Sequence, residues 1–361
     1  MSLTLEQIRG ALRGVGDTQT GAVPETALKD RDVRSEGGHV SVSIELGYAL
    51  GERQPALAGA LREALLQAGA ASADVQLRSA VQTHAVQRGL KPLGNVRNVI
   101  AVASGKGGVG KSTTSVNLAL ALAADGAKVG VLDADIYGPS IPMLLGLAGK
   151  PESHDGKTMM PLSGHGIQAN SIGFLIDADS PAIWRGPMVT QALEQLLRQT
   201  NWDDLDYLIV DMPPGTGDIA LTLAQKVPVA GAVIVTTPQD VALLDARKGL
   251  RMFQKVEVPV LGVVENMAVH ECSQCGHVEH IFGEGGGVRM AEQFDVPSLG
   301  SLPLSLDIRV QSDAGVPIFV AEPDGVAAQA YRQIARRLAV QIAGLPRDVS
   351  AKFPSVVVQR S

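Results

Sequence analysis

The sequence is poor in cysteine, in aromatic residues and in long apolar runs. Two cysteines among 361 residues are too few for the disulfide framework of a secreted scaffold. Phe, Trp and Tyr make up only 3% of the chain, so we expect a core of Ala, Val, Leu and Ile. No apolar run reaches the ~18 residues of a membrane span, and no apolar block follows a basic start as in a signal peptide. These absences favour a soluble protein of the cytoplasm with no membrane partner.

The charge balance limits the partners further. Lys and Arg number 31 and Asp and Glu 37, which gives a formal net charge of −6. A protein that coats nucleic acid needs a basic surface, so we expect no nucleic-acid partner. With 45% hydrophobic and 19% charged residues, the composition is that of a globular protein. The length of 361 residues corresponds to about two domains.

Periodicity divides the chain into four segments. The first reads as a small α/β domain, with a capping box at Thr4 and Gln7, a half-buried strand at 39–46 and a helical pattern at 55–69. A polar stretch with Gly and Pro follows as a linker, then a larger α/β domain, then a tail that we expect to be flexible. The four segments are residues 1–80, 81–95, 96–346 and 347–361.

In the larger domain, apolar strands alternate with helical patterns. The alternation predicts a mostly parallel sheet covered by helices on both faces. Apolar residues at steps of three or four between Ala327 and Ile342 indicate a final amphipathic helix. The expected strands are 99–104, 129–133, 207–211, 232–237 and 260–265, and the helices between them begin at Lys111, Gly186, Asp218 and Asp240.

A glycine-rich loop of this domain carries a phosphate-binding pattern. Residues 105–112 follow a strand, precede a helix and match the P-loop pattern G-x-x-x-x-G-K-[ST]. The glycines let backbone N–H groups form an anion nest at a helix N-terminus. Lys111 is expected to reach the β- and γ-phosphates of ATP, and the Ser112 hydroxyl to bind Mg²⁺. The expected binding residues are Gly105, Lys106, Gly107, Gly108, Val109, Gly110, Lys111, Ser112 and Thr113.

Acidic residues follow the next two expected strands. A carboxylate at the carboxyl end of a parallel strand points into the ligand crevice. Asp211 therefore reads as the acid near Mg²⁺, and Asp135 could orient the attacking water. Gly215 could supply a backbone N–H beside the γ-phosphate. Asp133 and Asp218 suit a helix cap or a turn equally well.

An early lysine distinguishes this P-loop from the general pattern. With Lys106 the loop reads Lys-Gly-Gly-Val-Gly-Lys-Ser-Thr, which resembles the deviant Walker A motif of the ParA/MinD-like ATPases. The resemblance implies that Lys106 reaches across a nucleotide-sandwich homodimer to the partner's phosphates, where a cation supplied in trans acts as an arginine finger does. Lys106, Lys111, Asp135 and Asp211 are then the catalytic residues. Read without the family, Lys106 is a solvated loop lysine.

Further motifs resemble the Mrp-type ATPases, which are iron–sulfur cluster carriers. They are residues 184–188, 211–218 and 265–267 and the Cys272-x-x-Cys275 pair. The resemblance implies that Asn266 contacts the adenine and that Pro303 walls the base pocket. Without the family, Asn266 suits a turn. The N-terminal segment is similar to the MIP18-like domain, but residues 47–51 lack the cysteine that many relatives of that domain carry.

Cys272 and Cys275 are the only cysteines of the chain. A C-x-x-C loop brings two thiolates to one soft metal centre, whereas a cubane cluster normally takes four cysteines. If the site is Cys-ligated, two subunits must each give a pair, which places a bridging 4Fe–4S cluster on a dimer axis. Three alternatives stay open: a Cys₂His₂ zinc site with His277 and His280, a dithiol redox pair, and two unpaired loop cysteines.

The resemblance thus implies an ATPase that binds a labile 4Fe–4S cluster. It would receive the cluster from an upstream scaffold and pass it to apo iron–sulfur proteins. ATP, Mg²⁺ and the bridging cluster are the expected cofactors, and a homodimer is the expected assembly. Two other classes remain: a spatial-positioning ATPase, and a nucleotide-switched scaffold with a structural zinc loop.

Overall fold

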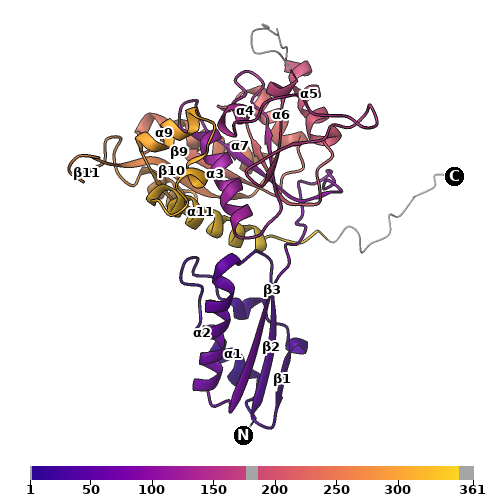
Figure 1. Cartoon of the computed structure of the whole chain (residues 1–361), viewed down its shortest axis with the longest axis vertical. Coiled ribbons are helices and arrows are strands. Elements are labelled where there is room, and N and C mark those ends of the chain that lie inside the picture. The colour runs from indigo at the N-terminus through magenta and orange to yellow at the C-terminus, as the bar shows by residue number, and fades with distance from the viewer. Residues whose placement is uncertain (1, 176–185, 349–361) are drawn as a thin grey trace, which may run out of the picture.

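The computed structural model describes residues 2–175 and 186–348. A small N-terminal body with its own sheet stands apart from a larger body built on one large sheet (Figure 1). The predicted α/β class, with a mostly parallel sheet behind a small preceding domain, is confirmed. Trp184 and Arg185 of the Mrp-type motif, and residues 349–361 of the expected tail, lie outside the described residues.

The N-terminal domain packs two helices on a three-stranded sheet. Strand β2 pairs antiparallel with β1 and parallel with β3, so α2 forms the crossover between β2 and β3. The capping box is present, because Thr4 Oγ1 accepts from the Gln7 N–H at 3.3 Å and Gln7 Oε1 accepts from the Thr4 N–H at 2.9 Å. The elements are α1 (Leu5–Arg13), β1 (Val33–Glu36), β2 (His39–Leu46), α2 (Gln54–Gln67), β3 (Ser72–Ser79) and the 3-10 helices η1 (Pro24–Ala27), η2 (Asp30–Asp32) and η3 (Gly51–Arg53).

The larger domain holds a sheet with the strand order β11-β10-β9-β4-β8-β5-β7-β6, and β12 also pairs with β10. The pairings are parallel except β6 with β7 and β10 with β11. Its strands are β4 (Val96–Ala103), β5 (Val129–Asp133), β6 (Leu162–Gly164), β7 (Ile167–Ser171), β8 (Leu205–Asp211), β9 (Gly231–Thr236), β10 (Val260–Glu271), β11 (Val278–Glu279) and β12 (Ser298–Pro303).

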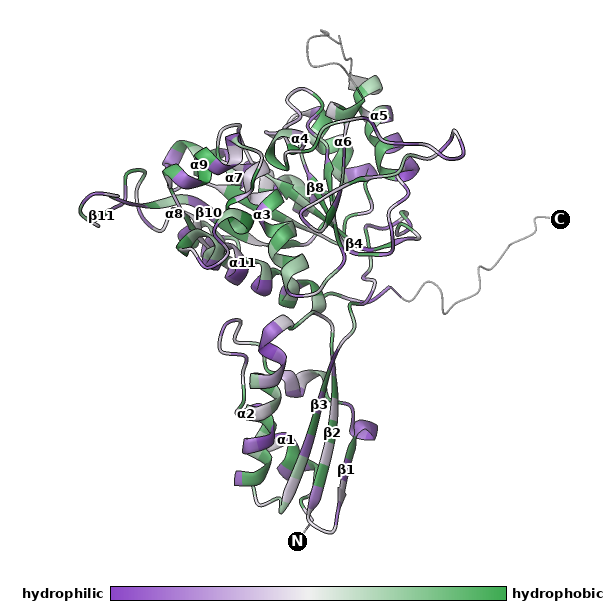
Figure 2. Ribbon diagram, viewed as in Figure 1, coloured by the Kyte–Doolittle hydropathy of each residue, from purple (hydrophilic) through white to green (hydrophobic). Residues whose placement is uncertain are grey.

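Helices cover both faces of this sheet because both faces are apolar (Figure 2). Alternate residues of β4 belong to different clusters: Ile100 packs with α3 and α11, and Val99 with α5, α6 and α7. The helices are α3 (Lys111–Ala124), α4 (Ile141–Leu144), α5 (Gly186–Gln199), α6 (Asp218–Lys226), α7 (Asp240–Lys255), α8 (Gly286–Gln293), α9 (Leu306–Asp313), α10 (Ile318–Ala321), α11 (Val326–Ala343) and the 3-10 helix η4 (Ile172–Phe174).

Four strands of this sheet, β6, β7, β11 and β12, are not predicted by the sequence pattern. Strands β6 and β11 are too short for periodicity to reveal them, and β12 contains Gly300 and Pro303, which weaken a strand signal. Strand β10 is expected to end at Glu265, but it continues to Glu271 and leads directly into the cysteine loop. This extension connects the nucleotide side of the sheet with the cysteines.

The predicted linker is held against the larger domain. His84 is buried, and its ring contacts Asn98 at 2.8 Å. The Gln87 side chain is buried as well and bonds to backbone groups around the end of α6. Asp348 donates its N–H to the Thr83 carbonyl at 3.0 Å, so residues 347 and 348 of the expected flexible tail pair with the linker.

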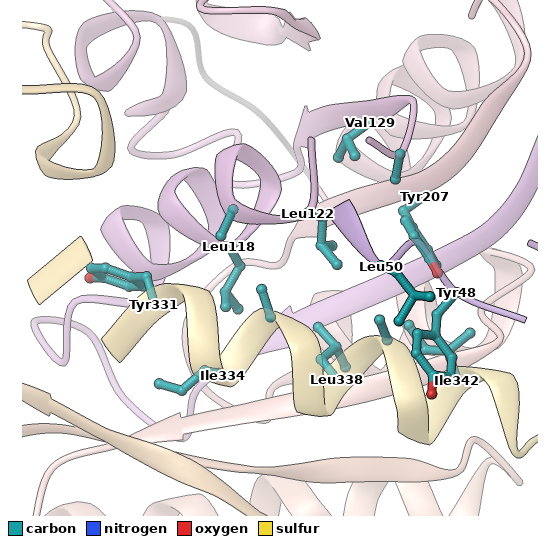
Figure 3. Packing of buried hydrophobic residues seen from close by; sticks show 14 of the residues in the cluster. Tyr48, Leu50, Leu118, Leu122, Val129, Tyr207, Tyr331, Ile334, Leu338 and Ile342 are labelled. Atoms are coloured by element: carbon teal, nitrogen blue, oxygen red, sulfur yellow. The ribbon is translucent and has the colours of Figure 1, made fainter. Parts of the chain in front are cut away.

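The loop at residues 47–51 docks the N-terminal domain on the larger one. Tyr48 and Leu50 are buried in one cluster with Ile342 near the end of α11 (Figure 3). Gly47 approaches α11 so closely that a Cβ there would lie 3.0 Å from the Ala343 Cβ. This segment contains no cysteine and serves as a packing contact between the two domains.

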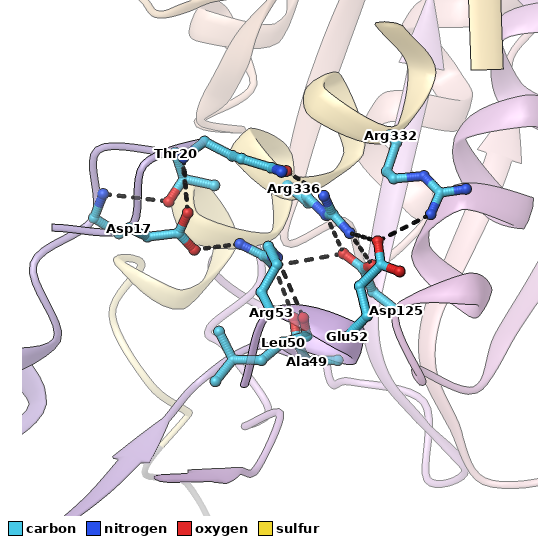
Figure 4. A network of polar contacts seen from close by, with 11 residues as sticks. Asp17, Thr20, Ala49, Leu50, Glu52, Arg53, Asp125, Arg332 and Arg336 are labelled. Carbon is cyan, nitrogen blue, oxygen red and sulfur yellow. Dashed lines mark hydrogen bonds and ion pairs between the residues drawn. The ribbon is translucent and has the colours of Figure 1, made fainter. Parts of the chain in front are cut away.

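Ion pairs border this contact (Figure 4). Arg336 of α11 donates to both oxygens of Asp125 at 2.8 Å. Arg53 pairs with Asp17 and lies 3.5 Å from the Asp125 carboxylate. Asp125 is the C-cap of α3, whose first residue is Lys111. The N-terminal domain therefore contacts the far end of the helix that begins at the P-loop.

Candidate nucleotide and cluster sites

The P-loop crosses the carboxyl edge of the sheet between β4 and α3. Gly108 and Gly110 have φ values of 80° and 79°, a left-handed conformation that glycine adopts without a Cβ penalty. A Cβ at Gly105 would lie 2.1 Å from the Asp245 backbone, and one at Gly110 would lie 2.2 Å from Asn266 Nδ2. Helix α7 and Asn266 thus lie in close contact with the loop, so Gly105 and Gly110 cannot be replaced by a residue with a side chain.

One carboxylate organises the beginning of α3. The Lys111 ammonium lies 2.8 Å from Asp211 Oδ1, and Ser112 donates to Asp211 Oδ2 at 2.6 Å. Ser115 donates to Asp211 Oδ1 at 2.7 Å, a contact that our sequence analysis missed. The signal was present, because Ser115 stands four residues after Lys111 and therefore on the same face of the helix.

A cavity of about 260 Å³ lies over this loop. It brings together most of the expected phosphate-binding residues with Asp135, whereas Asp211 lies behind Ser112 and is fully buried. The residues that line it are Ser104, Lys106, Gly107, Gly108, Gly110, Lys111, Ser112, Thr113, Asp135, Ser140, Leu144 and Pro214.

Two carboxyl groups at the end of β5 have different surroundings. Asp133 is fully buried and accepts from the Ser140 N–H at 3.0 Å, the Ile141 N–H at 3.1 Å and Ser171 Oγ at 3.0 Å. Burial first, and then the nearby Asp211 charge, raise the pKa of Asp133 to about 7. Burial also raises the pKa of Asp135, which lines the cavity. Asp133 thus caps α4 and holds the loop that carries Asp135.

Gly215 stands in the loop after β8, at the edge of the site. Its N–H donates to the Ser104 carbonyl at 2.9 Å, so in this structure that N–H is engaged by the backbone that precedes the P-loop. A contact between Gly215 and a γ-phosphate remains a prediction, and it requires this hydrogen bond to be exchanged.

Asn266 of β10 contacts the P-loop. Its Nδ2 donates to the Val109 carbonyl at 2.9 Å, and its Oδ1 accepts from the Met267 N–H at 2.9 Å. Pro303 is the register partner of Val269 three residues further along β10. The roles of Asn266 and Pro303 at the adenine remain predictions, as neither residue lines the cavity over the phosphates.

The two cysteines occupy the tip of a hairpin formed by β10 and β11. Cys272 donates its N–H to the His277 carbonyl at 2.9 Å, and the Gly276 N–H donates to the Cys272 carbonyl at 2.8 Å. Cys275 is exposed and Cys272 is half-buried. Backbone N–H groups of Gln274, then of Cys275, lower the pKa of the Cys272 thiol, which favours the thiolate that binds soft metals.

One of the two histidines of the zinc alternative, His280, contacts groups other than the cysteines in this structure. His280 Nδ1 lies 2.8 Å from the Ala268 carbonyl and must carry the proton there, because a carbonyl only accepts. His280 Nε2 lies 3.8 Å from Glu284. Across the part of the chain that the structure describes, no three His, Cys, Asp or Glu side chains gather closely enough to hold a metal ion.

Comparison with known proteins places the chain in a family. Residues 95–339 match the ParA family model, described as NUBPL iron-transfer P-loop NTPase, and residues 5–77 match an iron–sulfur cluster assembly protein model. The iron–sulfur cluster carrier protein of Pseudomonas fragi is 59% identical over 74% of this chain and 94% of its own length. That of Escherichia coli K12 is 55% identical over 78% of this chain and 76% of its own. The mouse iron–sulfur cluster transfer protein NUBPL is 53% identical over 73% and 85%, respectively.

Solved structures support the fold of the larger domain. A nucleotide-binding protein from Archaeoglobus fulgidus in complex with ADP is 39% identical, with a TM-score of 0.56 over 64% of this chain and 90% of that chain. The cell division ATPase MinD of Pyrococcus furiosus shares the fold. It is 22% identical, with a TM-score of 0.52 over 67% of this chain and 98% of that chain. Within residues 2–175 and 186–348, no helix is both long and apolar enough to cross a bilayer. The chain belongs to the NUBPL iron-transfer branch of the ParA-type P-loop NTPases, the family of the iron–sulfur cluster carriers.

Proposed function

We propose that this protein is a homodimeric, cytoplasmic ATPase that carries a 4Fe–4S cluster and transfers it to apo iron–sulfur proteins. The cluster is the cargo, and Cys272 and Cys275 of two subunits together supply its four thiolates. One observation carries this proposal. Both cysteines stand at the tip of one hairpin, partly open to solvent, and two thiolates are half of the four that a cubane cluster takes.

The phosphate side of the site supports ATP hydrolysis. Lys111 is 6% exposed and points to the cavity over the glycine nest, where the phosphates would compete with Asp211 for its charge. Asp135 would orient a water for attack on the γ-phosphorus, so that the bond from that phosphorus to the β–γ bridging oxygen breaks and ADP leaves. Lys106 of the partner subunit would stabilise the charge on the transferred group.

The oxygen donors beside Lys111 suit Mg²⁺. Ser112 Oγ lines the cavity, and Asp211 Oδ2 lies 2.6 Å behind it. A hydroxyl and a carboxylate are hard oxygen ligands of the kind that this ion accepts. Bound there with ATP, Mg²⁺ would neutralise charge on the β- and γ-phosphates. Asp211 also holds Ser115 and Lys111, so it keeps Ser112 pointing at that position.

The direct test is cluster transfer. Iron-loaded protein is mixed with an apo 4Fe–4S protein, with or without ATP and Mg²⁺, and the absorbance of the acceptor's own cluster is followed anaerobically. We expect transfer from the wild type and none from Cys272→Ala, with Ser273→Ala as the matched control on the same loop. Equal transfer by Cys272→Ala and wild type would contradict the proposal.

A further inference from the structure

The nucleotide side and the cysteine hairpin share one strand. Strand β10 runs from Val260 to Glu271 and carries Asn266 at the P-loop and, directly beyond its end, Cys272. A continuous backbone therefore connects Asn266 with the thiols. A displacement of Asn266 can reach the thiols only if the contacts that hold β10 on each side of Asn266 allow it.

Before Asn266, the strand is anchored. Glu265 is 3% exposed, and its carboxylate accepts from the Gly287 N–H in the first turn of α8. A Cβ on Gly287 would lie 2.9 Å from the Glu265 Cβ, so the helix and the strand are in close contact. In addition, Glu265 continues the parallel ladder with Thr236 of β9. Glu265 is therefore held both by α8 and by β9.

At Asn266 the strand is irregular. Met267 has a φ of 57°, a left-handed conformation that a side chain rarely adopts. The pairing of β10 with β12 shifts register between Glu265 and Val269. The Asn266 amide spans the irregularity, as Nδ2 bonds to Val109 of the P-loop and Oδ1 to the Met267 N–H. A change in the Asn266 contacts thus acts next to the irregular point of β10 that lies between the P-loop contact and the cysteine hairpin.

Beyond the irregularity, a histidine ties the hairpin to the strand. His280 follows β11, and its Nδ1 donates to the Ala268 carbonyl at 2.8 Å. His270 is similarly placed 3.1 Å from the Leu304 carbonyl after β12. The His280 bond joins the returning arm of the hairpin to the residue that follows Met267, so both arms move together.

We propose that β10 couples nucleotide binding to the geometry of Cys272 and Cys275, with His280 as the positioning residue. A ligand that changes the contacts of Asn266 turns the backbone at Met267, and the His280 bond to Ala268 passes that turn to both arms of the hairpin. The identity of the group that the thiols bind rests on the proposed function. The coupling between nucleotide and thiols is proposed for the metal-free chain.

The test uses the metal-free, full-length protein and the alkylation rate of its two thiols by iodoacetamide. The rate is measured without nucleotide, with ADP and with a non-hydrolysable ATP analogue, both with Mg²⁺. We expect nucleotide to change the wild-type rate by about 5-fold or more, the lower range of typical coupling between sites. In His280→Ala the rate should no longer respond, although the nucleotide still binds.

Three variants keep this test specific. His280→Asn places an amide nitrogen near the position of Nδ1 and should restore the response, whereas His280→Gln, which places its nitrogen near Nε2, should not. His277→Ala, on the same loop, should respond as the wild type does. A wild-type rate independent of nucleotide, an unchanged response in His280→Ala, or failure of His280→Asn to restore it would each overturn the proposal.

A second readout covers the case in which the His280 variants do not fold. Deuterium uptake of residues 268–280 in the wild type should change when ADP binds, and identical uptake would overturn the coupling. Both measurements omit iron, so they separate the two proposals. A responsive hairpin that never loads a cluster contradicts only the cargo, and a cluster carrier with an unresponsive hairpin contradicts only the coupling.

Discussion

The Lys111 ammonium lies 2.8 Å from the Asp211 carboxylate, whose other oxygen accepts from Ser112 at 2.6 Å. Two residues of the P-loop are therefore oriented by the last residue of a different strand, β8. This buried carboxylate holds a cation and a hydroxyl at the floor of the cavity. A cation and a hydroxyl that the fold holds in place before the ligand binds are the condition for electrostatic catalysis at the proposed phosphate site.

Turnover should depend on the residues that line the cavity. Lys111→Ala removes the positive charge that would neutralise the phosphates, and Asp135→Ala removes the carboxylate proposed to orient the attacking water. Each substitution should lower the rate of phosphate release by ~10²-fold or more. Asp135→Ala should fold because Asp135 lines the cavity, and Lys111→Ala leaves Asp211 with its hydrogen bonds from Ser112 and Ser115. Lys157→Ala, on an exposed loop, is the matched control. Near-wild-type turnover in both variants would show that the site is assigned wrongly.

Lys106 should act on the partner's nucleotide. Lys106→Ala should bind ATP almost normally but hydrolyse it slowly, and a mixture with Lys111→Ala subunits should regain activity because each heterodimer contains one complete site. Nucleotide binding is measured by fluorescence titration and turnover by phosphate release. Loss of ATP binding in Lys106→Ala alone would indicate an ordinary contact within one subunit.

The buried Asp133 should make stability depend on pH. Its pKa is about 7 in the folded chain and about 3.9 in an unfolded one. The folded state therefore binds more protons between these values, so the free energy of unfolding falls as pH rises from about 4 to 7 and levels off above. Asp133→Asn, which stays uncharged, should reduce this fall in urea unfolding at about pH 5 and 8.

The control for this prediction is Asp155→Asn. The Asp155 carboxyl is exposed, and backbone N–H groups of Thr158 and Lys157 lower its pKa to about 2, outside the window. This variant should keep the wild-type dependence. Equal slopes for Asp133→Asn and the wild type would refute a protonated Asp133 in the folded protein.

The junction between the domains should contribute to stability. Arg336→Ala removes two charged hydrogen bonds from Asp125, which is 8% exposed, and leaves it with the 3.5 Å contact to Arg53. Losing hydrogen bonds to a charged group in this way should cost ~1.5–3 kcal/mol. Arg309→Ala breaks an exposed pair with Asp313 and should cost less than ~1 kcal/mol. The comparison is made by urea unfolding, and equal midpoints for the two variants would argue against a stabilising junction.

The sequence predicts the P-loop and the central strands because their signals are local. Residues 129–133 form a strand with the predicted bounds, since a run of buried apolar residues leaves little choice. The short strand β11 and the bulge at Met267 depend on tertiary contacts instead. No sequence pattern predicts that Met267 adopts a positive φ or that His280 bonds to Ala268, because both depend on the contacts of β10 with neighbouring segments.

The residues of the candidate site likewise differ in whether the sequence alone identifies them. Lys111, Ser112 and Asp135 are identified by motif and strand position, and the structure brings them to one cavity. Asn266 is suggested only by family resemblance, since an amide after a strand has many uses. The docking of residues 47–51 on α11 was not foreseen, because Tyr48 and Leu50 lie in a loop without periodicity.

The shared cluster is tested most directly by anaerobic reconstitution with iron and sulfide, followed by iron analysis and mass determination in solution. The account predicts about four irons per dimer. Cys272→Ala and Cys275→Ala should each lose the iron and weaken the dimer, while ATP hydrolysis survives and the His277→Ala/His280→Ala double variant keeps its iron. One zinc per monomer, lost in that double histidine variant, would contradict the account.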